Sequence, residues 1–463
     1  MDLAEALERI ATLETENRAL RERLEALERR LSLNSTNSSK PPSSEGCPKA
    51  PRRTQSLRPK GQRRSGGQPG HRGQTLERVE HPDEVMEHAA PQVCGQCGYG
   101  LQAVPVSGVL KRQVFDIPAP LPQVTEHRVS LKICPGCQHR VQGQFPAGVS
   151  APVQYGERIR AVALYLHHYH FIPEDRLSEL LQALYGCSLR PATLATLTAT
   201  ACEALEPVVT ELANQLAAAP VKHLDETGCR IEGHRQWLHV VSTATTTWYR
   251  RCARRKDLEP PARLLGGVVV HDHWQAYFQL DGVVHALCNA HHLRELKALA
   301  ELDQESWAQR LSQLLQVACR YHHRYPDGVP LPLQQRIVAL YRRIVARGLA
   351  FHQALEPLPQ TPRRGRPKRR IGHNFLLRMQ QFDEAVLRFL RQPIVPFSNN
   401  QAERDLRMMK LKQKISGGFR SVKGAEAFMT IGSVLSTAQK RGLNLLDVLV
   451  IAVQGQTPTV LST

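Results

Sequence analysis

The sequence has no apolar run that approaches the ~20 residues a membrane-spanning helix needs, and its acidic first residues do not form a signal peptide. We therefore expect a cytoplasmic protein that contacts no membrane. Acidic residues are also scarce, because 42 Asp and Glu stand against 61 Lys and Arg, giving a formal net charge of +19. Such an excess favours polyanionic partners, and nucleic acid is the commonest of these.

Cysteines are few for 463 residues, and their odd number, eleven, argues against a disulfide framework. Two C-x-x-C pairs stand out, CGQCG at 94–98 and CPGCQ at 134–138, with β-rich segments such as KRQVFDI and VTEHRVSLKI between them. Four thiolates can bind zinc tetrahedrally, and a hairpin would bring the pairs together. We predict a zinc-ribbon-like β domain over 81–150, with structural Zn²⁺ on Cys94, Cys97, Cys134 and Cys137. Redox-active dithiols are the alternative interpretation.

The first 33 residues follow a heptad pattern. Asn17 interrupts one seam, which favours two parallel strands, and the other seam positions are apolar: Leu3, Ile10, Leu24 and Leu31 in one seam, Ala6, Leu13, Leu20 and Leu27 in the other. We predict a coiled coil over 1–33 through which the chain self-associates as a dimer or higher assembly. A single amphipathic helix packed on its own domain is the alternative. Residues 34–80 are rich in Ser, Pro, Gly and Arg, which predicts a basic flexible linker, either a solvated tether or a segment that orders on phosphates.

Residues 151–219 have a helical pattern throughout. In PEDRLSELLQALYG the leucines share one face, with Pro173 at the start and Gly186 at the end, and Pro191 opens the next helix. This pattern is typical of a helix-turn-helix DNA-binding domain, in which Arg190, Thr193 and Thr196 could face DNA. Two packed helices without a DNA role fit the same pattern.

Residues 220–455 carry three acids in a distinctive arrangement. Asp225 lies on the first predicted strand, VKHLDETG, and Asp272 follows the fourth, GVVVHD. A carboxylate at the lip of a buried strand needs a partner or a metal. In PFSNNQAERDLRMMK, Asn399 and Asn400 can cap a helix that begins near Gln401 and has Glu403 in its first turn. Three such acids suit a pair of Mg²⁺ or Mn²⁺ ions that act on a phosphodiester.

Basic residues follow the third acid. They form a ridge that could hold double-stranded DNA by its phosphates: Arg404, Arg407, Lys410, Lys414, Arg420 and Lys423. Between Asp272 and Glu403 the sequence predicts an all-α insertion at about 295–395. Within it, PRRGRPKRR at 362–370 is either an AT-hook for the minor groove or a disordered basic loop.

The order of these parts resembles the insertion sequence sixty-six family, a group of bacterial DDE transposases. The resemblance rests on the paired C-x-x-C motifs and on LDETG, HDHW, CNAHHLREL and NNQAERDLRMMKLKQKISGGFRS, with NSSKPPSSEG and GGQPGHRG in the linker. It implies a multidomain α+β and α/β chain with an RNase H-like mixed-sheet catalytic domain. It also implies catalytic and Mg²⁺-binding roles for Asp225, Asp272 and Glu403, cleavage at element ends, strand transfer into target DNA, accessory transposition proteins and association with the nucleoid.

Some positions fall outside this pattern. Lys410 has the spacing from Glu403 at which a wider group of DDE transposases contacts DNA, but Asn399 stands where those enzymes have an arginine. Cys288 and His291 match a C-x-x-H block of the family, for which a structural or zinc-binding role is one interpretation. Glu226 is left out of the triad because it should point to the opposite face of its strand. The alternative function is a catalytically silent DNA-binding protein, such as a domesticated repressor or element-end binder.

Overall fold

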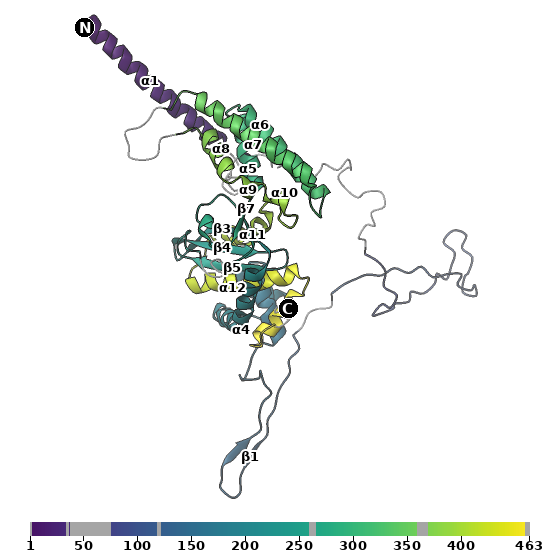
Figure 1. The fold of residues 1–463 in the computed structure, drawn as a ribbon. Coiled ribbons are helices and arrows are strands. Elements are labelled where there is room, and N and C mark those ends of the chain that lie inside the picture. The colour runs from purple at the N-terminus through teal and green to yellow at the C-terminus, as the bar shows by residue number, and fades with distance from the viewer. Residues whose placement is uncertain are drawn as a thin grey trace.

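A computed structural model describes residues 2–33, 37, 76–117, 122–258, 265–358 and 369–458. Most of the predicted basic linker, and PRRGRPKRR apart from its last two residues, lie outside the described residues. The chain is of mixed α/β type, with one five-stranded mixed sheet and many helices (Figure 1). None of the described helices has the length and apolarity to cross a membrane.

The five-stranded sheet has the order β5-β4-β3-β6-β7. Three consecutive antiparallel strands, β3 (Val221–Ile231), β4 (His234–Ser242) and β5 (Thr247–Cys252), form one side. The short strands β6 (Val268–His271) and β7 (Val284–Leu287) extend the sheet parallel to β3. All four residues of β6 are buried, as its unbroken apolar run suggests for an inner parallel strand. The strands predicted between residues 220 and 288 are thus confirmed.

Helices before and after the sheet cover it together. Along the chain, α2 (Glu157–Leu164), a π-helical turn (Tyr165–Tyr169), α3 (Glu174–Tyr185) and α4 (Pro191–Ala218) precede β3, while α12 (Val422–Lys440) and α13 (Leu445–Val453) close the described chain. The predicted helix boundaries are confirmed: Pro173 precedes α3, Pro191 is the first residue of α4, and Gly186 ends α3 with a φ of +64°. A left-handed residue at that position is easiest for glycine.

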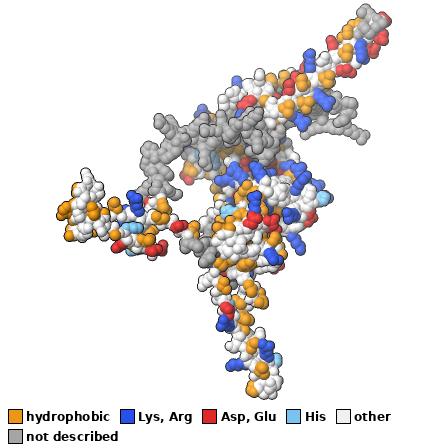
Figure 2. All heavy atoms as spheres, turned by 180° about the vertical axis from the view of Figure 1, so that it is seen from behind, with side chains coloured by type: hydrophobic (Ala, Val, Ile, Leu, Met, Phe, Trp, Pro, Cys, Tyr) orange, Lys and Arg blue, Asp and Glu red, His pale blue; other side chains and the backbone are white. Residues whose placement is uncertain are grey.

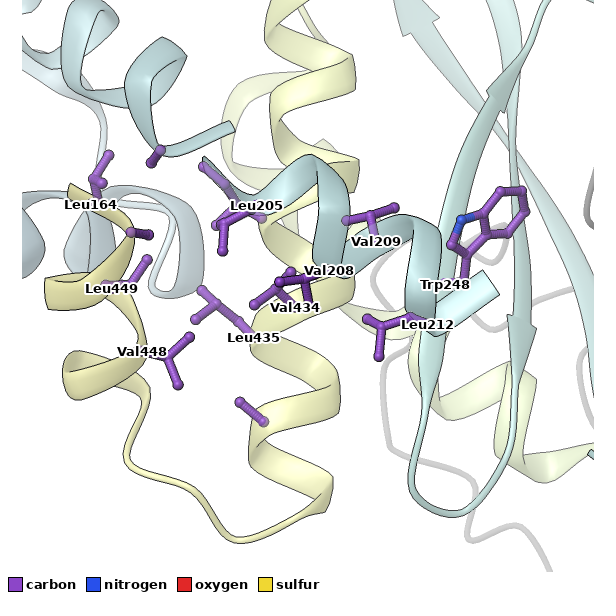
Figure 3. Packing of buried hydrophobic residues seen from close by; sticks show 14 of the residues in the cluster. Leu164, Leu205, Val208, Val209, Leu212, Trp248, Val434, Leu435, Val448 and Leu449 are labelled. Carbon is purple, nitrogen blue, oxygen red and sulfur yellow. The ribbon is translucent and has the colours of Figure 1, made fainter. Parts of the chain in front are cut away.

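The core beneath these helices is continuous with the sheet. Leu205, Val208 and Leu212 of α4 pack beside Val434 of α12 and Trp248 of β5 (Figure 3). Residues 157–218 therefore share one core with the sheet. At the start of α4, Arg190 and Thr196 are exposed and Thr193 is half-buried, so all three reach solvent; DNA contact by them stays a prediction.

A second helical region lies between β7 and α11 (Asn400–Ser416), where the all-α insertion was expected. It comprises α5 (Asn289–Glu301), α6 (Ser306–Arg324), α7 (Leu331–Ala354), α8 (Ile371–Gln381) and the short helices α9 (Asp383–Val386) and α10 (Arg388–Arg391). Its core centres on buried aromatic residues such as Tyr341 and Phe375 and also includes Val270 and Leu287 of the strands. The helical region is therefore anchored on the β6–β7 edge of the sheet.

The N-terminal heptads form α1 (Leu3–Ser32), which confirms the helix but not its association. Seam residues stay exposed in the single chain, including Ile10, Leu20 and Leu24. At its end, Arg29 donates to Asp303, with Nη2 2.7 Å from Oδ2, and so contacts the helical region.

Residues 76–150 have little regular structure where they are described. The short strands β1 (Leu131–Ile133) and β2 (Arg140–Gln142) form a hairpin around the second C-x-x-C pair. The expected strand over 111–117 is absent, and its apolar residues, such as Val114 and Ile117, are exposed. β-branched residues alone do not form a strand where no partner strand and no buried face are present.

Candidate active site

Two acids meet where β3 and β6 run side by side. The parallel register pairs His223 with Val270, so two residues further along Asp225 lies level with Asp272. Asp225 Oδ1 accepts a hydrogen bond from the backbone N–H of Glu226 at 2.9 Å. Asp272 follows the last residue of β6, and its Oδ1 accepts from the N–H of Trp274 at 2.9 Å. That bond fixes the turn that holds Asp272 beside Asp225.

The third acid, Glu403, is in the first turn of α11 (Asn400–Ser416), which packs on β3 and β4. Asn399 precedes the helix and is buried. Its side chain donates to the Leu224 carbonyl at 2.7 Å and accepts from His223 Nδ1 at 2.8 Å. Asn399 therefore ties the start of α11 directly to β3, at the two residues that precede Asp225.

The prediction that Asn399 caps this helix with its side chain is wrong, although the helix begins within one residue of the expected place. Its side chain makes no capping hydrogen bond. The reason is competition: the buried Leu224 carbonyl and the His223 ring need partners, and the Asn399 amide satisfies both.

The three predicted acids lie close enough for Asp272 and Glu403 to affect the ionisation of Asp225. Burial raises the pKa of the Asp225 carboxyl well above its usual value, and the charges of Glu226, Asp272 and Glu403 raise it further. Crowded carboxylates of this kind repel one another and favour either a proton or a cation between them. Carboxylate oxygens are the ligands that hard divalent cations prefer, so this donor set fits such an ion.

Glu226 lies on the other face of β3, as expected, but it is not a bystander. Its Oε1 accepts from Arg255 Nε at 2.8 Å and its Oε2 accepts from the Tyr277 hydroxyl. The Arg255 guanidinium in turn lies 4.5 Å from the centre of the Trp274 ring. Burial raises the pKa of Glu226 and the charge of Asp272 adds to this, against the hydrogen bond from Tyr277. This buried cluster supports the turn that carries Asp272.

A pocket of about 260 Å³ opens beside Asp272. Its lining includes two acids, two arginines, an indole ring and a C-x-x-H pair: Asp272, Glu295, Arg255, Arg378, Trp274, Cys288 and His291. Guanidinium groups match phosphate oxygens in geometry and charge. Each arginine is already paired, Arg255 with Glu226 and Arg378 with Glu295, so a phosphate bound here would compete with these carboxylates.

A comparison with models of known protein families identifies the family of the chain. The family model described as Transposase IS66 family matches residues 152–427, more than half of the 463 residues. The chain belongs to the IS66 transposase family. The resemblance read from the sequence motifs is thus confirmed. A second model, Family of unknown function (DUF6444), matches residues 1–77, and no curated protein matches the chain.

The matched region of this IS66-family transposase contains all three predicted acids and every strand of the five-stranded sheet. Membership makes the protein a nucleic-acid-acting enzyme of the transposase class, and it implies DNA binding and the use of a divalent metal. The roles of individual residues do not follow from membership and rest on the geometry.

The basic ridge of the transposase follows α11 into the start of α12. Five of its six residues are exposed: Arg404, Arg407, Lys414, Arg420 and Lys423. Lys410 is half-buried; burial lowers its pKa, while the charge of Asp225 opposes this shift. Lys410 thus faces the acids while the others face solvent. Blue Lys and Arg side chains also gather across the middle of the molecule on the face drawn in Figure 2.

The predicted zinc ligands come together only pair by pair. Backbone N–H groups, with the Cys97 thiol, lower the pKa of Cys94, and Cys134 is placed in the same way beside Cys137. Within the described parts of the chain, the group with metal-ligand spacing is a different one, Cys288, His291 and Glu403. A zinc ribbon on the four N-terminal cysteines of the transposase stays a prediction.

Proposed function

We propose that this protein is a DDE-type DNA transposase that cuts DNA at the ends of its insertion element and joins those ends to target DNA. The observation that carries the proposal is the alignment of Asp225 with Asp272 on neighbouring parallel strands, with Glu403 close enough for its charge to act on Asp225. The strand order, three antiparallel strands followed by two parallel ones, supports an RNase H-like catalytic domain over residues 220–455.

In this proposal Asp225, Asp272 and Glu403 would hold a pair of Mg²⁺ or Mn²⁺ ions. Two observations favour it: the carboxyl groups repel one another, and Glu403 Oε1 is buried without a hydrogen-bond partner among the described residues. Ions bound there would activate the attacking oxygen and stabilise the leaving oxygen of a phosphodiester.

The chain's own groups would position the DNA. The exposed ridge on α11 would contact phosphates without regard to sequence, and half-buried Lys410 would contact the phosphate nearest the acids. Arg255 would bind a phosphate from the pocket side, because Glu226 and the Trp274 ring hold its guanidinium in place.

Further assembly belongs to the same proposal. The exposed seam of α1 would pair with a second copy, so that two active sites could act on two element ends. A zinc ribbon on Cys94, Cys97, Cys134 and Cys137, the start of α4 and accessory proteins would contribute to recognition of the ends, at the nucleoid in the cytoplasm.

Cleavage of a labelled element-end duplex tests this function. Asp272→Asn should lower the rate of Mg²⁺- or Mn²⁺-dependent cleavage by roughly three orders of magnitude or more. The reason is that loss of one member of a set of catalytic groups that act together removes most of the rate enhancement. Binding to the duplex should persist. The matched control is Asp281→Asn, an exposed acid between β6 and β7, which should cut like the wild type. Wild-type protein that binds ends but never cuts would identify a catalytically silent DNA-binding protein instead.

A further inference from the structure

The C-x-x-H block converges with the third acid. Cys288 immediately precedes α5, His291 lies in the first turn of α5, and Glu403 lies in the first turn of α11. One ligand atom of each, the thiol sulfur, an imidazole nitrogen and a carboxylate oxygen, lies within 4.8 Å of the other two. His291 Nδ1 is 3.8 Å from Glu403 Oε1. Two helix starts from distant parts of the sequence thus meet around one small volume.

The facing atoms in this volume lie at ion-pair rather than hydrogen-bond distances. His291 Nδ1 and Glu403 Oε1 are both buried and have no hydrogen-bond partner among the residues that the structure describes. Arg294 Nη2 lies 3.5 Å from the same carboxylate oxygen, which balances charge. Buried polar atoms are normally satisfied, and two that face each other beside a sulfur suggest an ion between them.

The Cys288 sulfur is buried and held in place by a backbone hydrogen bond. Its residue is 1% exposed, and the backbone N–H of Asn399 donates to Sγ at 3.1 Å. Hydrogen bonds to a ligating sulfur orient it and stabilise its negative charge. Asn399 also immediately precedes α11 and ties it to β3. The same residue therefore holds in place both the thiol and the helix that carries Glu403.

We propose that Cys288, His291 and Glu403 form a binding site for a single Zn²⁺ ion. A thiolate and an imidazole select zinc over magnesium, and Zn²⁺ at its usual 2.0–2.3 Å from each ligand needs ligand atoms roughly 3.3–3.8 Å apart. The His291–Glu403 separation is 3.8 Å, a few tenths of an ångström longer than the ~3.4 Å expected of a nitrogen and an oxygen ligand, so a small side-chain shift would close the site on the ion. Three protein ligands leave the fourth tetrahedral position for a water or a substrate oxygen from the pocket that Cys288 and His291 line.

This site extends beyond the proposed cleavage chemistry, because it does not depend on Asp225 or Asp272. It shares Glu403 with them. One carboxylate would therefore face zinc on one side and the two strand acids on the other, so that zinc would fix its orientation.

Metal content of the full-length protein tests the site. The four cysteines of the two C-x-x-C pairs, at positions 94, 97, 134 and 137, are first replaced together by serine, so that any zinc they hold is removed. In this background we expect about one zinc per chain by elemental analysis, and a thiolate-to-cobalt charge-transfer band after exchange with Co²⁺. Adding Cys288→Ser should abolish both. Cys319→Ser, which removes a buried cysteine of α6 outside the cluster, is the matched control and should keep both.

A second variant guards against loss of folding. Glu403→Gln keeps the shape of the side chain and should weaken zinc binding by more than the roughly 10–100-fold that loss of an outer-shell partner costs, while circular dichroism stays unchanged. Zinc content and cobalt spectrum that survive Cys288→Ser in a folded chain would overturn the site. Asp225→Asn separates the two proposals, because it should abolish cleavage and leave zinc content unchanged. Cleavage that survives Asp225→Asn would contradict the catalytic proposal and leave the zinc site standing.

Discussion

At the scale of single residues, the two successive acids of β3, Asp225 and Glu226, have different hydrogen-bond partners. Glu226 has a guanidinium and a hydroxyl within hydrogen-bond distance, so its charge is matched. Asp225 accepts a hydrogen bond from the backbone N–H of Glu226, and the charges of three neighbouring carboxyl groups act on it. Its ionised form therefore destabilises the metal-free fold, as is common where a site is built for a ligand.

Replacing Asp225 with Asn should therefore stabilise the protein while removing its activity. The pKa of Asp225 is raised in the fold, so at neutral pH a neutral amide avoids a penalty that the carboxylate carries. We expect the melting temperature in EDTA to rise by roughly 2–4 °C, which corresponds to about 1 kcal/mol in a domain of this size.

Glu226→Gln is the matched control, one residue away on the other face. The pKa of Glu226 is raised too, but Tyr277 and Arg255 oppose that shift, so the melting temperature of this variant should rise less than that of Asp225→Asn. A lower melting temperature for Asp225→Asn would show that the carboxylate is stabilised by its surroundings and would contradict the electrostatic argument.

Individual residues also show which parts of the candidate site could be predicted from the sequence. Asp225, Asp272 and Glu403 were predictable because each stands at a recognisable position of a strand or helix. The partners of Glu226 were not, since Arg255 follows β5 through an irregular segment and Tyr277 comes from a short 3₁₀ turn. The role of Asn399 was missed because a helix start predicts a cap, whereas its real partners lie on β3, far away in sequence.

At the scale of elements, α11 combines a buried stripe with a basic outer face. Ala402, Leu406 and Met409 are buried at helical spacing against the sheet. Arg404, Arg407 and Lys414 are consequently turned to solvent. The helix thus orients Glu403 inward and its cations outward with one packing arrangement.

Replacing Arg404, Arg407 and Lys414 together with Ala should weaken DNA binding equally for all sequences. If each contacts one phosphate, the slope of log affinity against log salt should become shallower by about 3. Fluorescence anisotropy across a salt series measures it. Removing the same charge from α7, at exposed Arg336, Arg343 and Arg347, is the matched control. Equal salt slopes for both triple variants would exclude α11 as the phosphate-contacting element.

Helices α6 and α7 meet at a buried acid–imidazole pair. Glu305 Oε2 lies 3.2 Å from His352 Nε2. Burial raises the pKa of Glu305 to about 7, with Asp303 adding to this and Arg29 and Arg370 opposing it. Burial lowers the pKa of His352 to about 4. The two groups therefore pack as a neutral pair near pH 6.

The pair predicts a pH-dependent effect of Glu305→Gln. A raised pKa means that the wild type loses stability as pH rises from about 4.5 through about 7, whereas Gln does not titrate. The melting temperature of the variant relative to the wild type should therefore be higher at pH 8 than at pH 5. Glu301→Gln, on the exposed end of α5, should show no such trend. A difference that does not vary with pH would contradict burial of the Glu305 charge.

At the scale of the whole molecule, the two large cores meet at β6. The helices of residues 157–218 and the C-terminal helices pack on the sheet around one core. The helical region packs on the β6–β7 edge of the sheet around the other core. The sequence predicted these helices, because their leucines recur at helical spacing. It could not predict what they pack on, since an apolar stripe such as Leu205 to Leu212 matches any apolar surface.

Removing residues 1–33 should reduce the protein to single chains. The seam leucines of α1 are exposed in one chain and would be covered in a coiled coil. Light scattering should give at least twice the chain mass for the full-length protein and one chain mass for the truncated one. Leu20→Asp should act like the deletion, whereas Thr15→Asp, outside the seams on the same helix, should not. An unchanged mass after deletion would exclude α1 as the assembly element.

The long path from Asp272 to Glu403 has a consequence for protein synthesis. A ribosome must complete the whole helical region before α11 emerges, and only then can Asn399 join β3 and complete the acidic cluster. A polypeptide released before Asn400 would retain two of the acids and the N-terminal segments that we propose contact DNA, but not the third acid. We expect such prematurely terminated products to pair through α1 with intact chains without completing an active site, and so to antagonise the intact enzyme in the same cell.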